Sequence, residues 1–233
     1  EGYGRILRDK QGGVCRIIEQ KDAPPDVLKI QEVNTGVIAL KTSYLREWLP
    51  QIDNNNSQGE YYLTDLVAIA RRSGIKVVTK NPGFPQEVEG VNTRIQLSKL
   101  ERFYQQQKAE KIMMSGVTLA DPNRIDVRGS LSSGTDSFID INAVFEGVVK
   151  LGSNVSVGPN CLIIDSVIGD NVQVKANSVI ENSEIHNNAV IGPFARLRPG
   201  TVVCESAKIG NFVEIKNTQV GIGSKISHLS YVG

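Results

Sequence analysis

Two basic residues, a histidine and a tyrosine near the end of the chain have the chemistry of a small-molecule site. Arg198 in "ARLRPG" and Lys216 in "VEIKN" lie 18 residues apart, and His228 and Tyr231 follow in "SHLSYVG". An arginine fork and a lysine point charge can together bind a phosphate. Histidine exchanges a proton near neutral pH, which suits a general base. These residues can cooperate only if the chain repeats with a period that stacks them.

The chain repeats in this way from about residue 117 onward. Ile, Val, Leu or Phe recurs at every sixth position, apart from three steps of five, and a small or compact residue commonly follows four positions later. Six is neither the period of a helix nor that of a strand. It predicts a solenoid with three short sides in a coil of about 18 residues, and a β-sandwich with regular turns is the weaker alternative. The predicted core anchors are Ile139, Phe145, Leu151, Val157, Ile163, Ile168, Val174, Ile180, Ile185, Ile191, Leu197, Val203, Ile209, Ile215, Val220, Ile226 and Val232.

The coil register decides which charged side chains stack, at about 4.8 Å per coil. Counting by coils places Arg198 above Glu181 and below Lys216, and it places Arg196 below Glu214. We therefore expect an ion pair between Arg196 and Glu214. Cations on adjacent rungs repel each other, so Arg198 and Lys216 predict a shared anion such as phosphate. A pair of merely solvated cations is the alternative.

Residues 1–92 follow a different pattern. It predicts a helix within "YYLTDLVAIARRSG", which ends at Gly74. Short strands are predicted over "CRIIEQ" (15–20), "NTGVIALK" (34–41) and "IKVVTKN" (75–81). This order predicts an α/β layer in which helices pack on a sheet.

A connecting helix is predicted after this layer. The segment "TRIQLSKLERFYQQQKAEKIMM" (93–114) lacks Gly and Pro and is rich in residues that favour helices. It separates the mixed pattern of the first 92 residues from the six-residue repeat. The sequence thus predicts two differently built parts joined by a helix.

Composition disfavours several classes of protein. The net charge of +1 provides no basic field for nucleic acid. Neither a long apolar run nor a signal-peptide pattern is present, so we expect a cytoplasmic protein without nucleic-acid or membrane partners. Cys15, Cys161 and Cys204 are odd in number and widely spaced, which predicts free thiols. His186 and His228 are too few for an all-histidine metal site.

Six motifs resemble one bacterial family. They are "GPFARLRPG", "GNFVEIK", "SHLSYVG", "QEVNTGV", "NNNSQGEYYLTD" and "EVEGVNTRIQLSKLE". Over essentially the whole chain they resemble the bifunctional N-acetylglucosamine-1-phosphate uridyltransferase/glucosamine-1-phosphate N-acetyltransferase family. The resemblance implies an α/β plus all-β fold. Residues 1–92 would be the C-terminal part of a Rossmann-like uridyltransferase (pyrophosphorylase) domain, 93–115 a linker helix, and 116–233 a truncated left-handed parallel β-helix of hexapeptide repeats, the acetyltransferase domain.

The resemblance also implies two activities and a homotrimer formed through the β-helix. Acetyl passes from acetyl-CoA to glucosamine 1-phosphate, and uridyl then passes from UTP to N-acetylglucosamine 1-phosphate. The product, UDP-N-acetylglucosamine, is a precursor of peptidoglycan. The partners are thus sugar phosphates and nucleotides. The catalytic base of the family falls on His228, and its sugar-phosphate contacts fall on Arg198, Lys216 and Tyr231.

The uridyltransferase contacts of the family fall on four residues of the first part. They are Gly4, Glu19, Asn34 and Asn92, and Asn92 also matches a ligand of the catalytic Mg²⁺. A glycine permits close backbone approach, a carboxylate accepts hydrogen bonds from sugar hydroxyls, and amide oxygens suit Mg²⁺. Without the family match, each of these residues would be interpreted as a turn or cap residue.

The sequence departs from the family pattern at both ends. A glycine-rich nucleotide loop and a metal-binding aspartate are not found before Gly4, and the repeats stop at Gly233. We therefore expect a fragment that lacks uridyltransferase activity and is weak or inactive in acetyl transfer. One alternative is a nucleotidyltransferase-like protein, similar to ADP-glucose pyrophosphorylases, whose β-helix only oligomerises or regulates. Another is a non-catalytic scaffold, which leaves the motifs of the first part unexplained.

Overall fold

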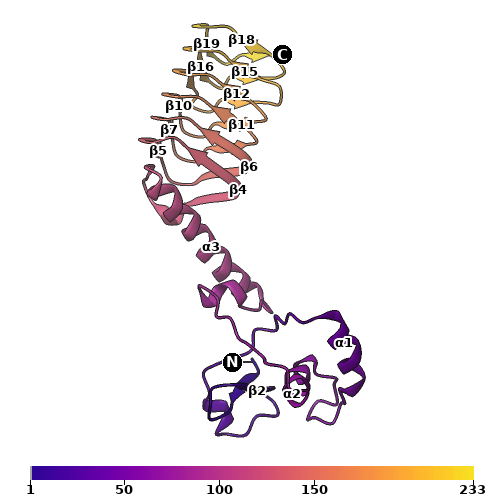
Figure 1. The fold of residues 1–233 in the computed structure, drawn as a ribbon. Helices are drawn as coiled ribbons and strands as arrows, with labels where there is room; N and C mark the ends of the chain where they lie inside the picture. Colours follow the sequence, from indigo (N-terminus) through magenta and orange to yellow (C-terminus); the bar gives the residue numbers. More distant parts are fainter. Residues whose placement is uncertain (1) are drawn as a thin grey trace. The chain divides into compact units, whose positions relative to one another are not determined.

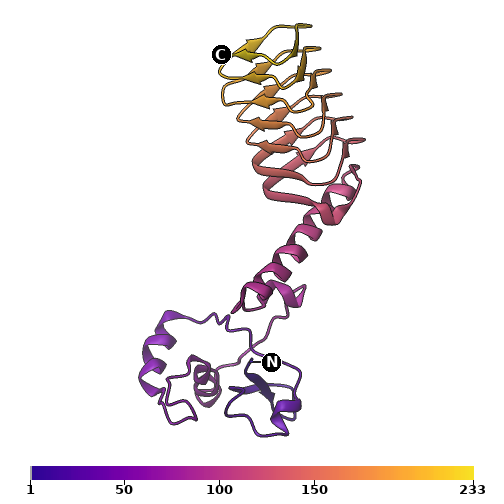
Figure 2. The same cartoon turned by 180° about the vertical axis from the view of Figure 1, so that it is seen from behind.

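The computed structural model describes residues 2–233, which form two compact units. Unit 1 ends at Asn92, and unit 2 runs from Thr93 to Gly233. Figures 1 and 2 show a stack of strands in unit 2 and a mixture of short helices and loops in unit 1. Each unit is described by itself below.

Unit 2 is a parallel β-helix with three sides. One side is the sheet β19-β16-β13-β10-β7-β5-β3, and the other two sides form one sheet because β4 and β6 each continue around a corner. In the first of these sheets, β3 with β5 joins Thr118 to Phe138, and all other successive coils pair residues 17 or 18 positions apart, for example Val190 with Lys208. The strands are β3 (Thr118–Leu119), β4 (Ile125–Ser133), β5 (Phe138–Ile139), β6 (Ala143–Leu151), β7 (Ser156–Val157), β8 (Leu162–Ile164), β9 (Val167–Ile168), β10 (Gln173–Val174), β11 (Val179–Glu181), β12 (Glu184–Ile185), β13 (Val190–Ile191), β14 (Arg196–Leu197), β15 (Val202–Val203), β16 (Lys208–Asn211), β17 (Glu214–Ile215), β18 (Gln219–Val220), β19 (Lys225–His228) and β20 (Tyr231–Val232).

The core of unit 2 confirms the six-residue repeat. Every predicted anchor from Ile139 to Val220 is at most 5% exposed. The last two anchors, Ile226 and Val232, are partly buried and pack against the same core. Compact residues four positions after an anchor are also buried at the corners, as with Ala189 and Ala207. The solenoid is therefore a continuous apolar column along its axis.

One corner of the solenoid is built from residues with left-handed backbone. Asn142, Asn160 and Asn177 have φ near +60°, a region that asparagine tolerates better than most residues. Their side chains form a ladder, in which Asn142 Nδ2 donates to Asn160 Oδ1 (2.9 Å) and Asn160 Nδ2 to Asn177 Oδ1 (3.2 Å). Phe194 and Phe212 continue this corner with φ of 55° and stacked rings, whose centroids lie 5.1 Å apart. The upper part of the corner is thus apolar, whereas the lower part is polar.

Helix α3 (Arg94–Met114) covers the first coil of the solenoid. Its first turn is closed by a capping box between Thr93 and Gln96. Farther along, the Gln105 side chain is 3% exposed and bonds both backbone groups of Val127 in β4, at 2.8 and 3.2 Å. Lys108 Nζ donates to the carbonyl oxygens of Val127 and Gly129 at 2.7 and 3.0 Å. An exposed strand edge can pair with other chains. Helix α3 covers the edge of β4 through these bonds, so it caps the solenoid as well as leading into it.

Unit 1 packs two helices beside a small sheet. Strands β1 (Arg5–Arg8) and β2 (Val14–Ile18) form an antiparallel pair. Val14 and Ile17 of β2 pack on Val67 of α2, and Trp48 of α1 packs on the other face of α2. The helices are α1 (Thr42–Trp48) and α2 (Leu66–Arg72), with 3₁₀ turns at Val27–Lys29, Leu49–Gln51, Leu63–Asp65 and Pro85–Val88. Unit 2 has one further 3₁₀ turn, at Pro122–Arg124.

Two strands predicted in unit 1 do not form, whereas the other elements do. The strand at 15–20, the helix within 61–74 and the helix at 93–114 are confirmed as β2, α2 and α3. Residues 34–41 and 75–81 carry no strand, so those two predictions are wrong. A strand requires a neighbour to accept and donate backbone hydrogen bonds along its length. Within residues 2–92, the backbone bonds that the structure shows for these segments are isolated ones, such as those from Asn34 to Gly4 and from Ile75 to Ala70. Val37 and Val78 are accordingly 78% and 76% exposed.

The three cysteines are free, as the sequence predicted. Cys161 and Cys204 are buried, and Cys15 is partly exposed. Burial raises the pKa of the Cys161 thiol, against the opposing effect of hydrogen bonds from the backbone of Ser178 and Asn177. A buried, protonated thiol is a poor nucleophile. Cys161 therefore fills a corner of the core.

Replacing Gln105 should destabilise unit 2 by loosening its cap. Gln105→Leu would leave the buried N–H of Val127 without its side-chain acceptor, whereas Val127 O would keep the bond from Lys108, and we expect a loss of about 1–3 kcal/mol. Urea unfolding followed by circular dichroism measures the loss. The matched control is Gln106→Leu, since Gln106 is exposed on the same helix and bonds only Glu110, at 3.3 Å. Equal stability of the two variants would contradict the capping role.

Candidate functional site

The upper coils of unit 2 hold the residues expected to act in acetyl transfer. Strand pairing places Arg196 of β14 opposite Glu214 of β17, and Glu214 opposite Tyr231 of β20. Two positions after Arg196, the backbone N–H of Arg198 donates to Ile215 O at 2.8 Å. Because Arg198 and Lys216 each lie two positions after such a pair, the predicted register is confirmed.

The ion pairs in these coils differ from the prediction. Arg198 Nη1 donates to Glu214 Oε1 at 3.0 Å, and Arg196 Nη2 lies 3.5 Å from Glu181 Oε2. The expected pair between Arg196 and Glu214 is therefore wrong. The physical reason is the length of the arginine side chains. Long side chains on adjacent strands also contact diagonal neighbours, and both arginines extend to a carboxylate two positions along the neighbouring coil.

These contacts change the electrostatics expected for an anion site. Glu214 compensates the half-buried Arg198 guanidinium and fixes its position. Within residues 2–233, no carboxylate forms an ion pair with the exposed Lys216. The group therefore keeps one uncompensated cation beside an oriented arginine. Such a group can bind a phosphate with one oriented fork and one mobile charge.

His228 and Tyr231 lie on two different sides of the solenoid. His228 ends β19 opposite Asn211, whereas Tyr231 begins β20. Leu229 lies between them with φ of 48° and turns the chain at the corner. His228 is exposed and Tyr231 is 63% exposed. The structure thus places Tyr231 on the side of Arg198 and Lys216, and His228 around the adjacent corner.

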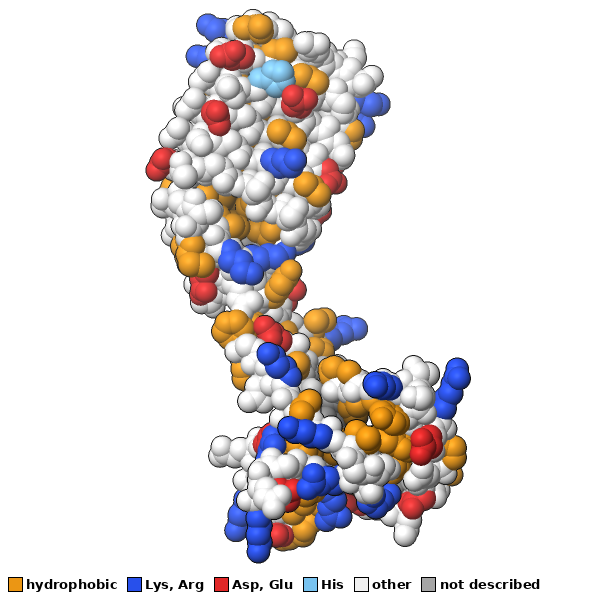
Figure 3. Space-filling model, viewed as in Figure 1, with side chains coloured by type: hydrophobic (Ala, Val, Ile, Leu, Met, Phe, Trp, Pro, Cys, Tyr) orange, Lys and Arg blue, Asp and Glu red, His pale blue; other side chains and the backbone are white. Residues whose placement is uncertain are grey.

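The surface around these coils shows no continuous basic patch on the face drawn in Figure 3. There, isolated charged side chains of both signs lie in a largely uncharged surface of unit 2. Nucleic-acid binding depends on many closely spaced cations. The upper coils on the face in view (Figure 3) show no such row of cations. Among residues 2–233, no helix has the length and low polarity needed to cross a bilayer.

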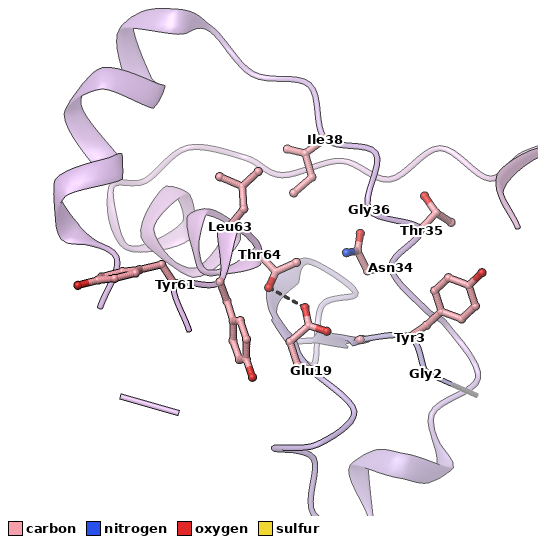
Figure 4. A pocket seen from close by; sticks show the side chains of 12 residues that line it. Gly2, Tyr3, Glu19, Asn34, Thr35, Gly36, Ile38, Tyr61, Leu63 and Thr64 are labelled. Atoms are coloured by element: carbon pink, nitrogen blue, oxygen red, sulfur yellow. Dashed lines mark hydrogen bonds between the residues drawn. The ribbon is translucent and has the colours of Figure 1, made fainter. Parts of the chain in front are cut away.

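Unit 1 contains a pocket of about 340 Å³ that gathers three of the four sequence-predicted residues (Figure 4). Gly4, Glu19 and Asn34 line it, although they come from three separate segments. Asn92 is not among the lining residues. The remaining lining residues, which the sequence analysis did not assign, are Gly2, Tyr3, Thr35, Gly36, Ile38, Tyr61, Tyr62, Leu63 and Thr64. The motif "NNNSQGEYYLTD" contains the last four of these residues, so the sequence could have indicated them.

The three predicted residues are in close mutual contact. The backbone N–H of Asn34 donates to Gly4 O at 2.8 Å, which joins the two segments. A Cβ at position 4 would lie 2.8 Å from Ile17 Cγ2 and 3.3 Å from both carboxylate oxygens of Glu19. Glycine is therefore required because the backbone at residue 4 lies directly against Glu19.

Glu19 is the one carboxylate among the described residues that line the pocket, and its charge acts on Asp65, which follows the lining residue Thr64. Burial raises the pKa of the Asp65 carboxyl, and the neighbouring carboxylates of Asp53, Glu19 and Asp22 raise it further, against Arg72. Carboxylate and amide groups together with three tyrosine rings provide acceptors, donors and flat apolar faces. This combination fits a ring that carries hydroxyl groups rather than a bare anion.

The structure gives no independent support for the predicted magnesium ligand. Asn92 lies outside the pocket lining. In the described part of the chain, no three His, Cys, Asp or Glu residues are grouped as metal ligands. Mg²⁺ is usually held by one or two carboxylates together with waters and phosphates. Asn92 alone does not provide such a site, so no chemical step is assigned to the ion.

The three-sided coils with a six-residue period define a hexapeptide-repeat β-helix protein. The family model "GMPPB C-terminal domain" matches residues 127–232. The "Bifunctional protein GlmU" of Marinobacter nauticus is 58% identical over 232 residues, which are 100% of this chain and 51% of that protein. The protein of the same name in Paraburkholderia phytofirmans is 52% identical with the same coverage. The chain therefore spans about half the length of the curated relatives that it matches.

These relatives confirm the resemblance drawn from the six motifs. Along its whole length the chain is similar to about half of these GlmU proteins, and its solenoid is a left-handed β-helix of hexapeptide repeats. Among solved structures, a mutant of AntD, an N-acyltransferase from Bacillus cereus, was found in complex with dTDP and coenzyme A. It matches 55% of this chain and 84% of its own, with 15% identity and a TM-score of 0.40.

A methyl group at position 4 should disturb the pocket from within. Gly4→Ala would force Ile17 or Glu19 to move, and we expect a loss of stability of about 1–3 kcal/mol. Urea unfolding measures the loss, and the ¹³C signal of the Glu19 carboxyl reports its displacement. Gly83→Ala is the control, because its Cβ would meet Glu87 at an ordinary 3.5 Å. An unchanged Glu19 signal in Gly4→Ala would contradict the close contact.

Proposed function

We propose that this chain belongs to an enzyme that makes UDP-N-acetylglucosamine in two steps. In the first, acetyl passes from acetyl-CoA to the amine of glucosamine 1-phosphate. In the second, uridyl passes from UTP to the resulting N-acetylglucosamine 1-phosphate, with Mg²⁺ as cofactor. Identities of 51–58% to GlmU proteins over the whole chain support the proposal. The observation that carries it is the pocket that gathers Gly4, Glu19 and Asn34.

Residues 1–92 are proposed to hold the sugar part of the uridyl acceptor. In this pocket, the Glu19 carboxylate accepts a hydrogen bond from a ring hydroxyl, and Asn34 contributes a side-chain amide. The backbone at Gly4 lies close enough to contact the same ring. Asn92 as a ligand of Mg²⁺ stays a prediction from the sequence.

Residues 116–233 are proposed to carry the acetyl transfer, with residues 93–115 as the linker. Arg198 and Lys216 bind the phosphate of glucosamine 1-phosphate, and Tyr231 adds a hydroxyl on the same side. His228 removes a proton from the amine as it attacks the thioester carbonyl. Fixing the phosphate fixes the approach of the amine. Direct attack requires no covalent intermediate on the protein.

The phosphate role of the stacked cations can be tested by binding. We expect Lys216→Ala and Arg198→Ala each to lower the affinity of the chain for glucosamine 1-phosphate about tenfold, because a charge-assisted hydrogen bond is lost. Isothermal titration or ligand-observed NMR measures the change. The matched control is Lys208→Ala, since Lys208 also stacks under a lysine, Lys225, but on another side of the solenoid. If all three variants bind as the unchanged chain does, the column is structural.

The role of His228 is tested by turnover in a polypeptide that carries this chain and transfers acetyl. His228→Ala should lower the rate at least about 100-fold, the usual contribution of a general base, and should leave uridyl transfer unchanged. Release of the coenzyme A thiol measures the first reaction. His186→Ala is the control, because His186 is an exposed histidine of the same solenoid that contacts Glu184 at 2.9 Å. Equal rates for the two variants would remove His228 from the mechanism.

A second candidate is a β-helix that serves only to oligomerise or regulate. Phe194 and Phe212 favour association, since they are 48% and 54% exposed and stack on one corner. We propose a homotrimer, and we expect Phe194→Ser combined with Phe212→Ser to lower the mass measured by sedimentation. A trimer that persists in this variant would exclude the corner as the interface. The two candidates differ in acetyl transfer, which a purely oligomerising solenoid lacks.

A further inference from the structure

Thr64 holds the carboxylate of Glu19 in the pocket of unit 1. Thr64 Oγ1 donates a hydrogen bond to Glu19 Oε1 at 2.8 Å, and Figure 4 shows both side chains pointing toward each other at the pocket wall. On another side of the same carboxylate lies the backbone of Gly4, so close that even a methyl group there would press on both oxygens. The carboxylate is therefore fixed from two sides.

The position of Thr64 is itself fixed by the core of unit 1. Thr64 lies in the 3₁₀ turn Leu63–Asp65, whose end is joined to α2 when the N–H of Leu66 donates to Leu63 O and Thr64 O. Leu66 and Ile69 of α2 are each 2% exposed and pack on Trp48. Threonine is branched at Cβ and has few rotamers. The hydroxyl therefore has little freedom to leave Glu19.

One neighbouring carboxyl interacts with Glu19. Burial raises the pKa of the Asp65 carboxyl, and the charge of Glu19 is among the groups that raise it further. Like charges repel, so the hydrogen bond from Thr64 holds the Glu19 carboxylate at the pocket wall against its repulsion from Asp65.

We propose that Thr64 is a positioning residue that sets which sugars the pocket accepts. This inference rests on the function proposed above. With Oε1 held by Thr64, the remaining lone pairs of Glu19 face the pocket in one orientation, so that they accept from one hydroxyl of the sugar ring. A site built to bond a hydroxyl rejects an analogue without it, because its own polar group is then left unpaired. Selectivity thus depends on the restraint as well as on the carboxylate.

The test compares three forms of the chain: unchanged, Thr64→Val and Thr64→Ser. Valine keeps the shape of threonine without the hydroxyl, whereas serine keeps the hydroxyl. The probes are N-acetylglucosamine 1-phosphate and its 3-deoxy, 4-deoxy and 6-deoxy analogues, with affinities measured by ligand-observed NMR. For the unchanged chain we expect one analogue to bind about tenfold more weakly than the parent sugar, and in Thr64→Val this difference should fall to about twofold. Thr64→Ser should restore most of it.

Matched controls separate positioning from a general structural role. Thr42→Val removes an exposed hydroxyl of unit 1 that lies outside the pocket lining, and it should keep the selectivity among the analogues. Glu19→Gln should remove selectivity, and Thr64→Val should then add little further loss, because the two changes disrupt one contact. Urea unfolding checks that all variants fold.

The outcomes also separate this inference from the function on which it rests. If the unchanged chain binds the parent sugar phosphate and Thr64→Val keeps its full preference among the analogues, the positioning role is overturned and the pocket remains a sugar site. If the unchanged chain binds none of the four compounds, the sugar site is overturned and the inference falls with it. Loss of selectivity in Thr64→Val with recovery in Thr64→Ser supports both.

Discussion

The stacking register of the solenoid is the constraint on which the arrangement of unit 2 depends. Beyond strand β3, each coil pairs with the next over 17 or 18 residues, as when Ile180 pairs with Leu197 and Leu197 with Ile215. The side chains of these three residues are fully buried and form one column of the core. A shift of the register by one residue would exchange the buried and the exposed positions along a coil. The apolar column therefore also fixes which polar side chains lie above one another outside it.

The same register explains why the charged residues of the upper coils form diagonal contacts. Vertical stacking brings Arg198 and Lys216 onto adjacent rungs, where like charges repel. The diagonal bond from Arg198 to Glu214 compensates one of the two cations without removing it from the surface. Arg196 makes the corresponding contact with Glu181, on the coil below. Backbone register thus decides the candidates for each contact, and side-chain length and charge decide among them.

Sequence periodicity predicted the solenoid well because its core depends on local spacing. Ile139 and Ile209, 70 residues apart, follow one rule and are both 1% exposed. The predictions of strands at 34–41 and 75–81 failed because a strand depends on a partner strand, which can come from any part of a chain. The pairing of Arg198 with Glu214 was missed for a smaller reason, since counting coils locates backbones and not the ends of long side chains.

The pocket of unit 1 shows the opposite relation between sequence and site. Gly4, Glu19, Asn34 and Thr64 come from four segments, and no period connects them. Resemblance to a family could indicate the first three, but the bond between Thr64 and Glu19 becomes visible only when the turn before α2 meets the end of β2. In the solenoid one repeated spacing positions every candidate residue. In unit 1 each candidate residue is positioned by its own tertiary contacts, so loss of the single Thr64 hydroxyl would release the Glu19 carboxylate without removing a residue of the core.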